Sequence, residues 1–200
     1  MARIHGVVAA AGLLLGCGSP AGSLDGSVKG HEVAVKEAVF TQLPDGELFI
    51  AAANQENLCA ILNGDQAPVK ELDLLEIHLA NWNGAGLDPI VTGTYAYLAT
   101  YTDGTAADPG RWSYARLFWT NGCDPYVPLA PSSGTVTVES VGLAQPGAQT
   151  VISTDLNFGG EHLSGQLKAT YCALAAQRGS AAVPDSSRTR AAQGGLCWNS

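Results

Sequence analysis

The sequence predicts an all-β protein, an antiparallel β-sandwich or barrel of about eight strands with one short helix. Eight segments alternate apolar and polar residues with a period of two, as half-buried strands do. The chain contains 24 glycines and 10 prolines, which favours many turns over long helices. The segments also follow one another at short spacing, as the strands of sandwiches and barrels do.

The length of 200 residues suits one domain with additional chain at both ends. We expect a leader at 1–16, a flexible tether at 17–27, the β-domain at 28–172 and a disordered tail at 173–200. The tether and tail are small and polar in composition. The hydrophobic fraction of 46% is sufficient for a core of normal size.

The net charge excludes one class of partner. The chain carries 18 acidic and 10 basic residues, a formal charge of −8, and has no basic stripe. We therefore expect no nucleic-acid partner. An acidic surface also repels anionic headgroups, so membrane attachment would need something other than charge.

The first residues have the features of an export signal. Arg3 supplies a positive charge, and Val7–Leu15 is an apolar run of nine residues. A spanning helix needs about 20 residues, whereas a signal-peptide core needs about 7 to 15. The segment is therefore expected to direct export.

The end of this run, Leu14-Leu15-Gly16-Cys17, resembles the lipobox of bacterial lipoproteins. The resemblance implies cleavage before Cys17, a diacylglycerol on its thiol and an acylated amino group. Membrane attachment would then occur through lipidated Cys17, and Gly18 at the next position favours the outer membrane. The alternatives are a soluble exported protein cleaved after Ala21 and an uncleaved leader.

Four cysteines remain beyond the lipobox: Cys59, Cys123, Cys172 and Cys197. An even number in an exported protein predicts two disulfides, with three alternative connectivities. Their separations contain no CxxC pair, so we expect no metal site formed by cysteines.

The eight segments predicted as strands share the alternation of apolar and polar residues; they are 27–40, 46–54, 71–82, 93–104, 111–122, 133–142, 148–158 and 162–172. In the third segment, for example, Leu75, Ile77 and Leu79 alternate with Glu76 and His78. The last three segments have short connections and are expected to form a meander.

One segment, 54–64, has apolar residues at helical spacing instead. Asn54 is expected to cap a short helix, Gly64 to end it, and Cys59 to lie on or beside its buried face.

The C-terminal half resembles the small β-rich lipoproteins of myxobacterial type. Ser133-Gly134-Thr135-Val136, Ser164-Gly165 and Tyr171-Cys172 carry this resemblance. It implies a fold and no particular activity.

Residue patterns for chemistry are sparse, and we expect no catalytic motif, cofactor or metal. His31 and His162 each adjoin a glutamate, but neither has a second histidine at ligand spacing. The loop residues Asp103, Asp108 and Asp124 suit either calcium or ordinary turns. Glu76 and Glu139 are the carboxylates considered for an envelope hydrolase.

Aromatic residues are concentrated between residues 82 and 126. They include Trp82, Trp112 and Trp119, which could bind a sugar ring if exposed or pack within the sheet if buried. We expect a lipid-anchored envelope protein with a non-catalytic binding or structural role and an envelope protein or polysaccharide as partner. The alternatives are a carbohydrate-binding module and an envelope hydrolase.

Overall fold

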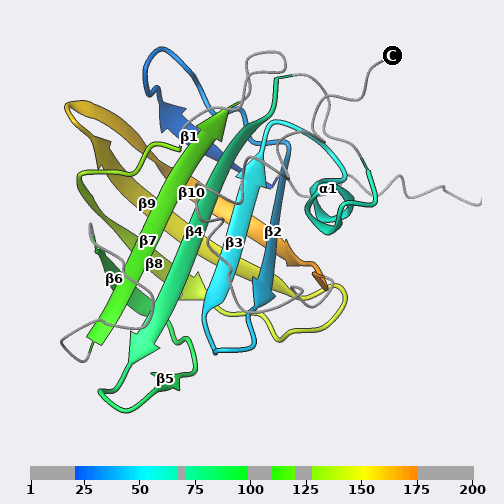
Figure 1. Cartoon of the computed structure of the whole chain (residues 1–200), viewed down its shortest axis with the longest axis vertical. Coiled ribbons are helices and arrows are strands. Elements are labelled where there is room, and N and C mark those ends of the chain that lie inside the picture. The colour runs from blue at the N-terminus through cyan, green and yellow to red at the C-terminus, as the bar shows by residue number, and fades with distance from the viewer. Residues whose placement is uncertain (1–20, 67–70, 99–109, 120–127, 175–200) are drawn as a thin grey trace, which may run out of the picture.

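The computed structural model describes residues 21–66, 71–98, 110–119 and 128–174 (Figure 1). These residues form an all-β fold with one short helix, as predicted. In chain order the elements are β1 (Gly22–Gly26), β2 (Glu37–Gln42), β3 (Leu48–Ala53), α1 (Leu58–Asn63), β4 (Asp73–Trp82), β5 (Leu87–Asp88), β6 (Gly93–Tyr97), β7 (Gly110–Trp119), β8 (Ser133–Ser140), β9 (Gln149–Phe158) and β10 (Glu161–Tyr171).

Eight of these strands form a closed barrel. The order of neighbours is β10-β2-β3-β4-β7-β6-β8-β9, and β9 pairs again with β10. β1 and β5 are additional strands, paired with β10 and β4. Within the described residues, the β10–β2 and β6–β7 pairs are parallel and the other pairs of the ring are antiparallel. The predicted meander of β8, β9 and β10 is confirmed.

The barrel interior holds the main hydrophobic core. Alternate residues of the strands point inward, as Leu75, Ile77 and Leu79 of β4 do, and these three are fully buried. Eight strands enclose a space that side chains just fill. The largest fully buried side chain, Tyr95 of β6, lies in this cluster, and its hydroxyl donates to the Val91 carbonyl at 2.9 Å. The interior is therefore a packed core.

A second apolar cluster lies on the outer face of β2 and β3, beneath α1. It comprises Val39, Leu43, Phe49, Ala51, Ala53, Leu58, Leu74 and Cys172. All six residues of β3 are buried, because the strand packs against the interior on one side and this cluster on the other. Cys59 of α1 and Cys172 after β10 form a disulfide with a Cα–Cα distance of 5.7 Å.

The helix is shorter than predicted, because it begins at Leu58 and Asn54 does not cap it. Asn54 instead bonds to Asp73 across the sheet end. Asn57 occupies the cap position without a side-chain cap bond, and the Glu37 carboxylate accepts from the Leu58 amide at 3.0 Å. Gly64 ends the helix in the left-handed conformation, as expected.

Two N-terminal expectations require correction. Residues 22–26, expected within the flexible tether, form β1 and pair with β10 from Gly22↔Leu167 to Gly26↔Leu163. This pairing is allowed because Gly165 has no side chain: a Cβ there would lie 2.1 Å from the Ser23 carbonyl oxygen. The first predicted strand, 27–40, contains regular strand only from Glu37.

The expected leader and most of the expected tail lie outside the described residues. Among the residues that the structure describes, no helix is long and apolar enough to cross a membrane.

Candidate functional site

The three tryptophans considered for ligand binding do not share one exposed face. Trp119 points inward and is buried in the main core. Trp112 lies on the outer face of β7 and is also buried, with 8% of its surface exposed. Trp82 is half-buried at the end of β4, diagonal to Trp112 on the same outer face. The structure therefore brings two of the three together and separates the third.

The outer face of β4 and β7 carries a cluster of charged side chains, which we call the outer-face charged cluster: Glu47, Glu76, His78 and Arg116. The Nδ1 atom of His78 lies 3.2 Å from a carboxylate oxygen of Glu47, and both side chains are buried. Phe49 packs edge-on against the His78 ring, with 5.1 Å between ring centroids. The Glu47–His78 pair is therefore a pair of titratable groups buried beside an aromatic side chain.

Arg116 extends this cluster along β7. It lies directly opposite Glu76 in the β4–β7 register. Its guanidinium carbon lies 5.0 Å from the Tyr114 ring centroid and 5.9 Å from that of Phe118, which favours cation–π attraction. Arg116 is 6% exposed, and its Nε atom has no hydrogen-bond partner among the residues that the structure describes.

Burial shifts the protonation of two groups around Arg116. It raises the pKa of the Glu76 carboxyl, although nearby His78 and Arg116 partly oppose this rise. It also raises the pKa of Tyr97 to about 12; neighbouring Tyr114 adds to the rise and Arg116 opposes it. The Glu76 carboxyl thus lies opposite the Arg116 guanidinium, and the Glu47 carboxylate contacts the His78 imidazole. This arrangement favours an electrostatic contact between strands over a free acid–base pair.

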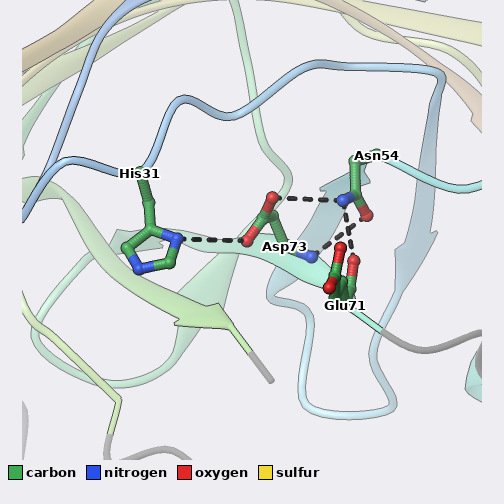
Figure 2. Close-up of polar contacts among 4 residues, drawn as sticks. All are labelled: His31, Asn54, Glu71 and Asp73. Carbon is green, nitrogen blue, oxygen red and sulfur yellow. Dashed lines mark hydrogen bonds and ion pairs between the residues drawn. The ribbon is translucent and has the colours of Figure 1, made fainter. Parts of the chain in front are cut away.

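A second polar network closes one end of the barrel (Figure 2). The Asn54 amide nitrogen donates to the Asp73 carboxylate at 3.1 Å and to the Glu71 carbonyl at 2.8 Å, while the Asp73 amide donates to the Asn54 side-chain oxygen at 3.0 Å. The His31 Nδ1 lies 3.9 Å from the same Asp73 carboxylate. His31 also stacks on Trp119, with ring centroids 4.3 Å apart.

Through His31, this network connects the chain before β2 to Asp73 at the start of β4 and to Trp119 at the end of β7. Burial raises the pKa of Asp73; the nearby His31 opposes the rise and Glu71 adds to it. The Asn54 side chain accepts from the backbone amide of Asp73 in β4 and donates to the backbone carbonyl of Glu71 (Figure 2). The arrangement indicates a structural closure of the barrel end.

A third polar group lies on the opposite, exposed wall. Glu139 of β8 accepts from the Ser153 hydroxyl of β9 and from the Gln166 amide of β10 at 2.8 Å. These hydrogen bonds lower the pKa of Glu139. His162 and Asp155 pair nearby, with 2.9 Å between Nε2 and the carboxylate oxygen. This wall is polar, whereas the wall beneath α1 is apolar.

The structure does not bring the other candidate catalytic and metal-binding residues together in one site. Glu76 and Glu139 lie on β4 and β8, with β7 and β6 between them, and the strand registers also place them far apart along the strand direction. His31, His78 and His162 each pair with a different carboxylate. The described part of the chain contains no group of three His, Cys, Asp or Glu side chains suited to a metal ion.

Several candidates lie outside the described residues: Cys17, Cys123, Cys197, Asp103, Asp108 and Asp124.

Sequence reasoning missed Glu47 and Arg116 as members of a common cluster. The available signal was the alternation of β4 and β7, which places Glu76 and His78 on one face and Arg116 on the matching face of the next strand. Glu47 precedes β3 and carried no comparable signal.

No protein-family model matches this chain, and no curated protein or solved structure matches it either.

Proposed function

We propose that the chain is a lipid-anchored protein of the cell envelope, acylated at Cys17, with a non-catalytic binding or structural role. The observation that carries the proposal is the disulfide between Cys59 and Cys172. Structural disulfides form and persist in oxidising compartments outside the cytosol. This bond supports export, and the lipobox-like Leu14-Leu15-Gly16-Cys17 then supplies the anchor.

The packed interior supports a role at the outer surface of the barrel. Because apolar side chains from all eight ring strands meet inside, a ligand would bind to the walls or the loops. The two walls differ in character, since one is polar around Glu139 and the other is apolar beneath α1. An envelope protein or polysaccharide partner would bind this surface. The lipid on Cys17 would attach the protein itself to the outer membrane.

Metabolic labelling with a clickable palmitate analogue tests the anchor. The wild type should incorporate the label and fractionate with membranes, and Cys17→Ala should do neither. Cys197→Ser serves as the matched control, because it removes a cysteine without touching the lipobox or the Cys59–Cys172 disulfide. Equal labelling of wild type and Cys17→Ala would overturn the lipid anchor.

The export argument has its own test. Non-reducing peptide mapping of protein isolated from cells should recover the peptides of Cys59 and Cys172 as one linked species. Recovery of both residues as free thiols in freshly alkylated cells would contradict residence in an oxidising compartment.

A further inference from the structure

The exposed apolar side chains of the described residues gather at one end of the barrel. The large hydrophobic residues found exposed there are Val91, Val141 and Leu143, with Leu143 70% exposed. Val91 precedes β6, whereas Val141 and Leu143 follow β8. These two segments are neighbours, because Gly93 at the start of β6 pairs with Val138 near the end of β8.

The loop that carries Leu143 is held in place by hydrogen bonds. The Gly142 amide donates to the Thr150 hydroxyl at 3.0 Å, and the Gln145 amide donates to the Leu143 carbonyl at 2.8 Å. The Ala148 amide donates in turn to the Gln145 carbonyl at 3.1 Å. An ordered turn therefore holds Leu143 in solvent. An exposed leucine side chain contributes little to the stability of the fold.

The chain enters the barrel close to this loop. The Ala21 carbonyl accepts from the Lys168 amide of β10, at 2.7 Å. Three residues further along β10, the Tyr171 amide donates to the Ala148 carbonyl at the end of the loop. In Figure 1 the loop between β8 and β9 lies beside the arrowheads of β2 and β10. A rise of about 3.3 Å per residue puts these two contacts about 10 Å apart along β10.

The length of chain before Ala21 limits how far the barrel can stand from a lipid on Cys17. Three residues lie between Cys17 and Ala21, which makes four Cα-to-Cα steps, and an extended chain spans at most about 3.6 Å per step. The Cα atoms of Cys17 and Ala21 therefore lie within about 14 Å of each other. If Cys17 is acylated, this end of β10 is held against the headgroup layer.

The charge of the loop suits such contact. Residues 140–154 contain no acidic side chain, although the exposed Glu139 directly precedes them at the end of β8. Lys168 on β10 and Arg111, whose guanidinium donates to the Thr92 carbonyl before β6, add cations on this side. Asp45 in the β2–β3 turn and Asp88 in β5 lie at the same end of the barrel as the β8–β9 loop, but beside other strands.

We propose that the β8–β9 loop is a membrane-contacting surface, which inserts Leu143, with Val141 and Val91 beside it, into the lipid interface next to the acylated Cys17. The proposal rests on the lipid anchor proposed above. The surface orients the barrel, so that the end closed by His31 and Trp119 points away from the membrane.

Bromolipid quenching of an added tryptophan tests this orientation. Full-length lipidated protein carrying Leu143→Trp is reconstituted into vesicles of phosphatidylethanolamine and phosphatidylglycerol, with and without brominated acyl chains. The matched control is Glu32→Trp, an exposed position near His31 at the other end of the barrel. The wild-type protein supplies the emission of the four native tryptophans, which is subtracted from both variants.

We expect bromolipids to quench the emission added by Leu143→Trp at least twofold more than that added by Glu32→Trp. Equal quenching at the two positions, in protein that carries palmitate and floats with vesicles, would overturn the proposed orientation alone. Loss of palmitate labelling and flotation in the wild type would instead overturn the anchor itself. Leu143→Ser should still float, because the acyl chains and not the loop provide the attachment.

Discussion

Glu47 and His78 form a buried hydrogen-bonded pair on the outer wall of the barrel, with 3.2 Å between the imidazole Nδ1 and the carboxylate oxygen. Glu47 precedes β3 and His78 belongs to β4, so the pair connects two neighbouring strands outside the packed interior. Buried polar groups of this kind stabilise a fold only while both partners are present.

Removal of one partner of this pair should destabilise the protein. Glu47→Ala leaves the buried imidazole of His78 without its carboxylate, so we expect the free energy of unfolding to fall by about 1–3 kcal/mol. Urea denaturation followed by far-UV circular dichroism measures the change. Glu32→Ala, at an exposed position, should stay within about 0.5 kcal/mol of wild type. A Glu47→Ala protein as stable as this control would show that the pair contributes nothing.

Loss of the disulfide should have a larger effect. Cys59 and Cys172 are separated by 113 residues, and a cross-link closing such a loop contributes about 4–5 kcal/mol in the chain-entropy model. Cys59→Ser and Cys172→Ser should each lower the free energy of unfolding by this order, and the double variant should lose no more than either single one. Additive losses in the double variant would contradict a bond between these two residues.

The pKa of Glu76 predicts a pH dependence of stability with a defined sign. Because burial raises the folded-state pKa above the ordinary value of 4.5, the folded state binds the proton more tightly than the unfolded state. The free energy of unfolding should therefore fall as pH rises from 4.5 through the raised value. Glu76→Gln should flatten this slope in chemical denaturation series between pH 4.5 and 7, and an unchanged slope would exclude Glu76 as its source.

Glu139 should behave in the opposite way. Hydrogen bonds from Ser153 and Gln166 lower its folded-state pKa, so its contribution is present above pH 4.5 and is lost as pH falls through the lowered value. Glu139→Gln should reduce the loss of stability on the acid side and leave the slope above pH 5 unaffected.

The β1–β10 pair depends on one glycine. Gly165 has φ near +152°, and an added Cβ would meet the backbone of Ser23. Gly165→Ala should detach β1 and destabilise the protein by about 1 kcal/mol or more. Hydrogen exchange should lose protection at the Ser23 and Asp25 amides, which face β10 in the hydrogen-bonded pairs of this register, while the amides that β9 and β10 share stay protected. Unchanged protection at Ser23 and Asp25 would show that β1 tolerates the side chain.

The strands of the barrel were predictable because their alternation is local. In β4 the inward positions Leu75, Ile77 and Leu79 could be assigned from period alone, and the structure confirms them. β1 could not be predicted, because the residues GSLDG carry no apolar alternation and their pairing depends on Gly165, which is distant in sequence.

The candidate site was less predictable than the fold, since its geometry is set by contacts between distant segments. The start of α1 is displaced from Asn54 because Asp73, nineteen residues away, binds the Asn54 side chain. Similarly, the sequence left three disulfide connectivities open, and only the approach of α1 to the end of β10 selects Cys59 and Cys172. Alternation placed Glu76 and His78 on the outer face but could not show that this wall is buried.

The position of β1 outside the closed ring has a mechanical consequence. A pulling force applied at Ala21 is transmitted first to the five β1–β10 residue pairs, which it loads in shear along the strand axis. The eight-strand ring is closed by β10–β9 and β10–β2, so its own strand pairs need not separate for β1 to detach. Release of β1 would lengthen the connection to the ring while the barrel stays intact. We therefore expect β1 to detach before any strand of the ring when the N-terminal chain is pulled.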